Sequence, residues 1–210
     1  MNELQLELKK QLEKFCLAKI EPFMEHDDER EEFRMSIFTE LGELGFCGMT
    51  IPENYGGAGL NYQDCAVALE EIAKYSVPYA VTVSVSTMVQ SIINDFGNEK
   101  QKTTFLPALT AGKEIGAFCL SESGAGSDAS SLKTTAKKVE GGYILNGTKL
   151  WITSGGIAKT YIGMARPGGE GSKGVSSFIV RDGTPGLSFG KKEKKMGWRT
   201  SPTREVIFEN

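Results

Sequence analysis

The sequence predicts an α+β protein, in which an N-terminal all-α helical domain is followed by a middle domain built as a β-barrel or β-sandwich. Two patterns support this. Through about residue 112, apolar residues recur every three or four positions, as on one face of a helix. After Gly116, short apolar runs alternate with Gly-Gly, Asn-Gly and Pro-Gly turns, which is typical of short strands. We therefore expect two domains, residues 1–114 and residues 115–210.

The first domain is expected to begin with two amphipathic helices. The first carries a stripe formed by Leu4, Leu8, Leu12 and Phe15. The second is predicted to run without interruption from Asp28 through Leu44, where Gly45 closes it. The following stretch, FCGMTIPENYGGAGLNYQD, is rich in glycine but carries apolar anchors, so it is predicted to be a structured loop.

Three more helices are predicted. One begins after Asn61, and the last spans about Asn98 to Ala111. Between them lies VPYAVTVSVSTMVQSIINDF, from Val77 to Phe96, which has one acid and no base. Its β-branched residues would allow a strand, but the stretch is far longer than an ordinary strand, so a buried helix is predicted.

The second domain is expected to consist of strands and tight turns. The stretch KTTAKKVEGGYILNGTKLWITSG is predicted to form three strands joined by turns at Gly141-Gly142 and Asn146-Gly147. The runs TYIGMARP, GVSSFIVRD, GLSFGKK and TREVIFEN supply further strands.

Composition excludes several classes of function. The net charge of −3 argues against a nucleic-acid partner, which would require a basic surface. No apolar run approaches the roughly 20 residues of a membrane span, and the N-terminus resembles neither a signal nor a transit peptide. The four cysteines lack metal-ligand spacing and are expected to be buried in a reducing compartment. His26 is the only histidine, so neither a histidine triad nor a metal site is expected.

Two segments are candidate binding elements. In CLSESGAGSDASS, Gly124 and Gly126 would let a ligand approach the backbone, whose N–H groups can bind an anion. Hydroxyls are added by Ser121, Ser123 and Ser127, although a plain turn explains the loop equally well. In GTKLWITSG, Trp151 and Thr153 would share one strand face, which suits a flat heteroaromatic ligand. A core aromatic residue is the alternative for Trp151.

Together these segments resemble the acyl-CoA dehydrogenases, FAD enzymes that desaturate acyl-CoA thioesters between Cα and Cβ. CLSESGAGSDASS is similar to the first family signature and NGTKLWITSGG to its second flavin segment. IPENYGGAGLNYQD is similar to the Pro-Glu-x-x-Gly-Gly loop between the N-terminal helices. The resemblance covers essentially the whole chain. The sequence departs from many members at Ser123, where they have proline, and at Ser154, where they have asparagine.

The resemblance implies roles for individual residues. Ser121 would bond the pyrimidine edge of the flavin, Trp151 would cover the isoalloxazine, and Thr153 would reach its N5 region. Ser127 would lie between FAD and the acyl-CoA substrate. The full set of residues implied in cofactor binding is Phe118, Cys119, Leu120, Ser121, Glu122, Ser123, Gly124, Ala125, Gly126, Ser127, Trp151, Ile152 and Thr153.

In the family, the glutamate base that removes the α-proton lies in a C-terminal helical bundle, which also builds a homotetramer or dimer. The sequence ends at TREVIFEN, so we expect that bundle and base to be absent and the chain alone to be inactive. An electron-transfer flavoprotein is the expected electron acceptor. The compartment would be the bacterial cytoplasm or, after loss of a transit peptide, the mitochondrial matrix.

The stretch GLSFGKKEKKMGWRTSPTREVIFE resembles short-chain and branched-chain members of the family, in particular those that act on isobutyryl-CoA. Two alternatives remain open. One is an acyl-CoA oxidase or nitroalkane oxidase of the same superfamily, and the other is a non-catalytic fragment that binds FAD or acyl-CoA.

Overall fold

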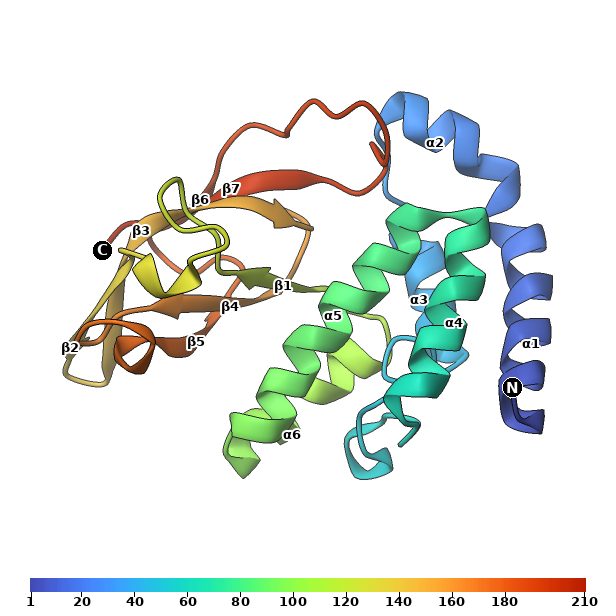
Figure 1. Ribbon diagram of the computed structural model, residues 1–210, viewed down its shortest axis with the longest axis horizontal. Coiled ribbons are helices and arrows are strands. Elements are labelled where there is room, and N and C mark those ends of the chain that lie inside the picture. Colours follow the sequence, from blue (N-terminus) through green and yellow to red (C-terminus); the bar gives the residue numbers. More distant parts are fainter. The chain divides into compact units, whose positions relative to one another are not determined.

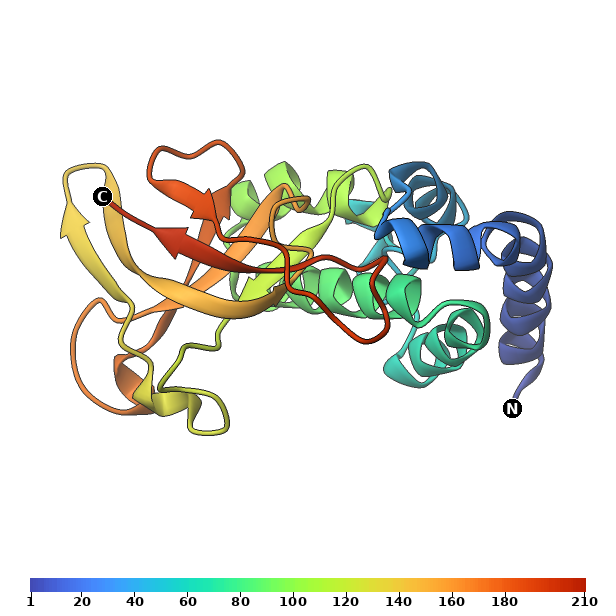
Figure 2. The same ribbon diagram turned by 90° about the horizontal axis from the view of Figure 1, so that it is seen from above.

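The computed structural model describes residues 1–210 and divides into two compact units (Figures 1 and 2). The helical unit comprises Met1–Ile115 together with Lys194–Ser201. The strand unit comprises Gly116–Glu193 together with Pro202–Asn210. All α-helices lie in the first unit and all strands in the second, so the predicted order of helices followed by strands is confirmed.

The helical unit consists of six α-helices and two short 3-10 helices. They are α1 (Glu3–Lys19), η1 (Glu21–Phe23), α2 (Met24–Arg30), α3 (Met35–Glu43), η2 (Glu53–Tyr55), α4 (Tyr62–Tyr75), α5 (Val77–Phe96) and α6 (Glu99–Thr110). Helix α1 packs on α4, α4 on α5, and α5 on α6. The side chains of Asn2, Asn61 and Asn98 accept hydrogen bonds from first-turn N–H groups of α1, α4 and α6, which fixes where these helices begin.

The prediction of one helix from Asp28 to Leu44 is wrong. Helix α2 ends at Arg30, the next residue, Glu31, has a left-handed backbone (φ 55°), and α3 begins only at Met35. The guanidinium of Arg34, in the connection, donates to both carboxylate oxygens of the buried Asp27, at 2.6 and 2.7 Å. The apolar pattern of the sequence continues across the break between α2 and α3, so the pattern did not indicate the break. The end of the helix before Gly45 (φ 86°) is confirmed.

Helix α5 is confirmed as the buried helix that the length of its apolar stretch predicted. Val83, Val89 and Ile93 are fully buried in the core of the helical unit. One stripe of α5 is not buried by this unit; it consists of Val81, Val85, Met88, Ile92 and Phe96. Even α5 does not combine the length and apolar character that a helix needs to cross a bilayer, and no other helix does.

The strand unit contains two sheets. The strands are β1 (Gly116–Cys119), β2 (Thr135–Val139), β3 (Gly142–Thr153), β4 (Thr160–Ala165), β5 (Ser176–Arg181), β6 (Leu187–Phe189) and β7 (Thr203–Phe208). One sheet has the order β1-β4-β5, in which β1 and β4 are parallel. The other is antiparallel, with the order β2-β3-β7-β6. The predicted strand-rich domain is confirmed, and neither sheet closes into a barrel.

The predicted turn at Asn146-Gly147 is wrong, because β3 runs through both residues without interruption. Thr148 pairs with Ile207 of β7, and the neighbouring Gly147 pairs with Phe208. Gly147 (φ 153°) is required for another reason: a Cβ there would lie 2.3 Å from Oγ1 of Thr134. The Gly141 turn between β2 and β3 is confirmed, with φ 81° at Gly141.

The prediction that the four cysteines are buried is confirmed. All four cysteines are unpaired by disulfides and buried. The side chain of His26 is exposed to solvent and contacts Asp27 through Nδ1 at 3.0 Å.

Candidate functional site

The loop of residues 120–134 connects β1 to β2 in the strand unit. Its residues alternate between two environments. Glu122 and Ala125 are buried, as is Cys119 at the end of β1, whereas Ser123, Gly124, Gly126 and Ser127 are exposed. A Cβ at Gly124 or Gly126 would meet nothing within 4 Å. One side of the loop is therefore open to a ligand, and buried residues such as Cys119 and Glu122 can line it only through their backbone.

The carboxylate of Glu122 closes this loop. It accepts hydrogen bonds from the backbone N–H groups of Lys133 (2.6 Å) and Thr134 (3.0 Å), and from Oγ1 of Thr134 (2.5 Å). Glu122 and Ala125 also exchange two backbone hydrogen bonds across the loop tip, at 3.0 and 3.1 Å. One side chain near the start of the loop thus holds its end.

Lys149 supplies the charge that balances Glu122. Its side chain is fully buried, and its Nζ donates to Oε1 of Glu122 at 2.7 Å and to the carbonyl of Leu120 at 3.1 Å. Burial alone would raise the pKa of Glu122, but hydrogen bonds from Lys149, Thr134 and two backbone N–H groups lower it to about 2. Glu122 is therefore ionised at neutral pH, and both of its carboxylate oxygens accept hydrogen bonds.

The loop is hydrogen-bonded to the part of β3 that contains Trp151. The N–H of Leu150 donates to the carbonyl of Ser121 at 2.8 Å. Ser121 is thus bonded to the residue that precedes Trp151. The pairing of β3 with β7 shifts between Lys149 and Ile152. Within this bulge Trp151 has φ 56°, and the residue is 64% exposed.

The bulge changes the expected relation between Trp151 and Thr153. A regular strand would place both on one face, but a bulge interrupts that alternation. Ile152 is buried and Thr153 is half-buried, while Trp151 remains exposed. The alternative of a core aromatic residue does not hold for Trp151, since a core residue would not leave most of its surface in solvent.

Ser154, where many family members have asparagine, combines a strained backbone with a buried, unpaired hydroxyl. Its backbone is left-handed (φ 64°), its side chain is fully buried, and Oγ has no hydrogen-bond partner. Its N–H donates to the carbonyl of Pro202 at 2.8 Å. A buried unpaired hydroxyl beside Thr153 marks a place where a bound group could supply the missing partner.

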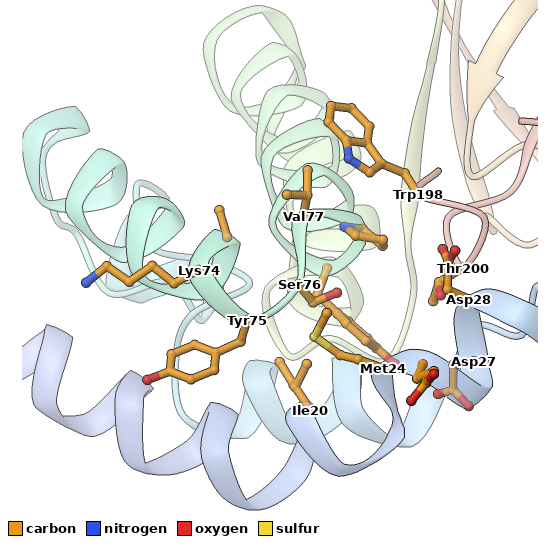
Figure 3. A pocket seen from close by; sticks show the side chains of 14 residues that line it. Ile20, Met24, Asp27, Asp28, Lys74, Tyr75, Ser76, Val77, Trp198 and Thr200 are labelled. Atoms are coloured by element: carbon orange, nitrogen blue, oxygen red, sulfur yellow. The ribbon is translucent and has the colours of Figure 1, made fainter. Parts of the chain in front are cut away.

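The helical unit contains a separate cavity of 530 Å³ (Figure 3). Its walls come from the end of α1, from α2, from the junction of α4 and α5, and from the segment 194–201. Ile20, Val77 and Trp198 give it an apolar lining. Two of the three acids that line it, Asp27 and Asp28, are already paired, with Arg34 and Arg199 respectively. Asp27 also belongs to a cluster with His26 and Glu32 whose possible metal-ligand atoms lie within 4.8 Å of one another, but its carboxylate is already bonded to Arg34 and His26.

Comparison with known families identifies the chain. A family model described as the acyl-CoA dehydrogenase N-terminal domain matches residues 2–113, and one described as the acyl-CoA dehydrogenase middle domain matches residues 117–210. The chain belongs to the acyl-CoA dehydrogenase family. The middle-domain match contains the complete loop of residues 120–134 together with Lys149 and Trp151.

Curated relatives in this family include isobutyryl-CoA dehydrogenases. The mitochondrial enzyme of Dictyostelium discoideum is 44% identical over 93% of this chain and 47% of its own length. That of Bos taurus is 40% identical over 100% of this chain and 50% of its own length. The chain thus spans about half the length of the curated acyl-CoA dehydrogenases that it matches.

Solved acyl-CoA dehydrogenase structures have the same fold. Butyryl-CoA dehydrogenase of Megasphaera elsdenii superposes with a TM-score of 0.92 at 39% identity, covering 100% of this chain and 56% of that one. A glutaryl-CoA dehydrogenase of Mycobacterium smegmatis in complex with FADH2 gives 0.93 at 30% identity, covering 100% and 53%. A chain from a study of the electron transferring flavoprotein of Acidaminococcus fermentans gives 0.94 at 38%, covering 100% and 56%.

Proposed function

We propose that this chain binds FAD and forms part of an acyl-CoA dehydrogenase that desaturates a short or branched acyl-CoA thioester. The observation that carries the proposal is the attachment of an open, glycine-containing loop to the bulge that exposes Trp151, through the hydrogen bond from Leu150 to Ser121. Family membership and the isobutyryl-CoA dehydrogenase relatives support the substrate class.

The residues fit a flavin in their chemistry. Trp151 offers a flat apolar surface to a fused ring, and the hydroxyls of Ser121 and Thr153 can pair with its polar edge. The lack of side chains at Gly124 and Gly126 leaves the backbone accessible to a pyrophosphate. The chemistry that FAD supplies when bound is acceptance of the hydride that leaves Cβ. Exposed Ser127 is proposed to contact the acyl-CoA.

Removal of the α-proton needs a carboxylate whose pKa suits proton transfer. The acids inside the loop signature are Glu122 and Asp128. Four hydrogen bonds and a pKa of about 2 make Glu122 a weak base. Hydrogen bonds from the hydroxyls of Ser130 and Ser131 likewise lower the pKa of Asp128. We therefore place the base of the whole protein outside residues 1–210. We also propose that the whole protein is a homo-oligomer that passes its electrons to an electron-transfer flavoprotein, in the bacterial cytoplasm or the mitochondrial matrix.

The test is FAD titration of the purified chain, followed by quenching of flavin fluorescence. Trp151→Ala should weaken FAD binding by about tenfold or more, as expected for loss of one aromatic stacking surface. Trp198→Ala is a matched control, because Trp198 is also exposed and also has a positive φ (57°) but lies in the helical unit. Unchanged affinity and spectrum in Trp151→Ala would remove Trp151 from the site.

The oxidase alternative differs in the electron acceptor. In the whole protein, anaerobic reduction by isobutyryl-CoA followed by a pulse of oxygen separates the two functions. The flavin of a dehydrogenase should stay reduced for much longer than one turnover, whereas the flavin of an oxidase should be reoxidised at once.

A further inference from the structure

A buried polar network joins the loop to β3, and its members Glu122 and Lys149 lie within two residues of Ser121 and Trp151, which are proposed to hold the flavin. It consists of Glu122 at the start of the loop, Thr134 at its end, and Gly147 and Lys149 in β3. Lys149 is 0% exposed, Thr134 2% and Glu122 8%. The polar atoms of the ion pair are thus removed from solvent.

The network connects three segments of the chain at fixed distances. Nζ of Lys149 reaches both the carboxylate of Glu122 (2.7 Å) and the carbonyl of Leu120 (3.1 Å). Oγ1 of Thr134 donates to the same carboxylate oxygen, at 2.5 Å. Gly147 permits this approach, because any Cβ there would collide with Thr134.

The position of Lys149 relates the network to the site. Lys149 is the last residue of β3 in regular register before the bulge that contains Trp151. Its bond to the carbonyl of Leu120 immediately precedes the bond from Leu150 to the carbonyl of Ser121. The buried pair therefore fixes the backbone on both sides of Ser121, at Leu120 and Glu122, and lies two residues before Trp151.

We propose that Glu122, Lys149 and Thr134 form a positioning device that sets the separation of the 120–127 loop from Trp151 and so shapes the flavin site before FAD binds. The proposal rests on the proposed function. Glu122 and Lys149 are positioning residues, since their charged atoms face each other in the interior and do not reach the open side of the loop. A buried ion pair is costly to desolvate, and its retention here is explained by the geometry that its hydrogen bonds impose.

The experiment compares variants of the chain by hydrogen exchange without FAD and by FAD titration. Lys149→Met keeps the length of the side chain and removes its charge. Glu122→Gln/Lys149→Met removes both charges, and so avoids leaving one buried charge unpaired. Val180→Ala is the control for general loss of stability, because Val180 is buried in β5 of the other sheet.

Lys149→Met should accelerate amide exchange across residues 121–134 by at least tenfold and weaken FAD binding by at least tenfold. The double variant should recover thermal stability but retain weak FAD binding, because the bond to the carbonyl of Leu120 is still missing. Val180→Ala should lower the melting temperature with FAD affinity within twofold of the unmodified chain.

Two results would overturn the proposal. One is recovery of unmodified FAD affinity in the double variant. The other is loss of affinity in Lys149→Met no greater than in Val180→Ala at equal loss of thermal stability. Failure of the unmodified chain to bind FAD would instead refute the proposed function, and the exchange of residues 121–134 would still decide whether Lys149 orders the loop.

Discussion

Gly147 and Thr134 lie so close that no side chain fits between them: a Cβ on Gly147 would be 2.3 Å from Oγ1 of Thr134 and 2.8 Å from its Cα. Such distances are well inside van der Waals contact. The approach lets Thr134 donate to Glu122 and places the end of the loop directly on β3. A residue with the appearance of a turn glycine is therefore a packing glycine.

Gly147→Ala should lower the free energy of unfolding by at least about 2 kcal/mol, because the new methyl group must displace Thr134 or the strand. Urea unfolding followed by circular dichroism measures this. Gly142→Ala, in the same strand, is the control, since a Cβ there meets nothing within 4 Å. Equal stability of the two variants would contradict the assignment.

Stability should fall in acid because of Glu122. Its pKa is lowered from 4.5 to about 2 in the folded chain, so between these values the unfolded state binds the additional proton. The stabilisation that comes from ionised Glu122 is fully present above about pH 5 and is lost as the pH falls toward 2. Urea unfolding from pH 6 to pH 2.5 should show a shallower pH dependence for Glu122→Gln than for the unmodified chain. Parallel curves would show that Glu122 does not titrate this way.

Arg34→Met should destabilise the helical unit by about 3 kcal/mol, because it leaves the buried carboxylate of Asp27 without its cation. The exposed pair of Lys19 and Glu40, at 2.9 Å, provides the comparison. Lys19→Met should cost no more than about 1 kcal/mol. Thermal unfolding of both variants measures the difference, and a similar cost for the two would mean that burial of Asp27 contributes little.

Self-association is expected from the uncovered stripe of α5. Phe96 is 81% exposed and Met88 40%, and with Val81, Val85 and Ile92 they form an apolar surface of roughly several hundred Å², the size typical of an interface. Light scattering should detect oligomers of residues 1–210, with ANS binding, and Met88→Gln/Phe96→Gln should reduce both. A monodisperse monomer with little ANS binding and a sharp thermal transition would instead favour the alternative that the chain is a self-sufficient module that binds FAD or acyl-CoA.

Residues 1–210 should not oxidise isobutyryl-CoA at a rate comparable to an intact family member. Loss of a general base reduces rates by about 10²–10⁴-fold, and Glu122 is not a substitute. A dye-linked assay with FAD present measures the rate. Robust turnover by this chain would require a base within it, and Glu122→Gln would then be the first variant to examine.

Much of the helical unit could be predicted from local patterns. The length of the apolar run identified α5, and asparagine caps marked the beginnings of α4 and α6. The break between α2 and α3 could not be predicted, because its left-handed residue, Glu31, carries no glycine signal and the Asp27–Arg34 pair nearby is a tertiary feature.

The candidate site was predicted in outline only. The residue types predicted that Gly124 and Gly126 would leave the loop backbone accessible. The family resemblance implied that Trp151 would face a ligand. The pairing of Glu122 with Lys149 could not be predicted, since 27 positions separate them and a lysine in a strand ordinarily faces solvent. The bulge at Trp151 also gives no sequence signal, because a tryptophan rarely adopts positive φ.

The segment 194–201 has a consequence for how the chain acquires its structure. Arg199 binds Asp28 through its backbone N–H (2.6 Å) and its Nε (3.1 Å), across 171 positions of sequence. During synthesis all six helices emerge before this segment exists, so its contacts with the helical unit are among the last that the unit can form. The bond between Asp28 and Arg199 can therefore form only after β1 to β6 have been synthesised, and a nascent chain halted before residue 194 would lack the partner of Asp28.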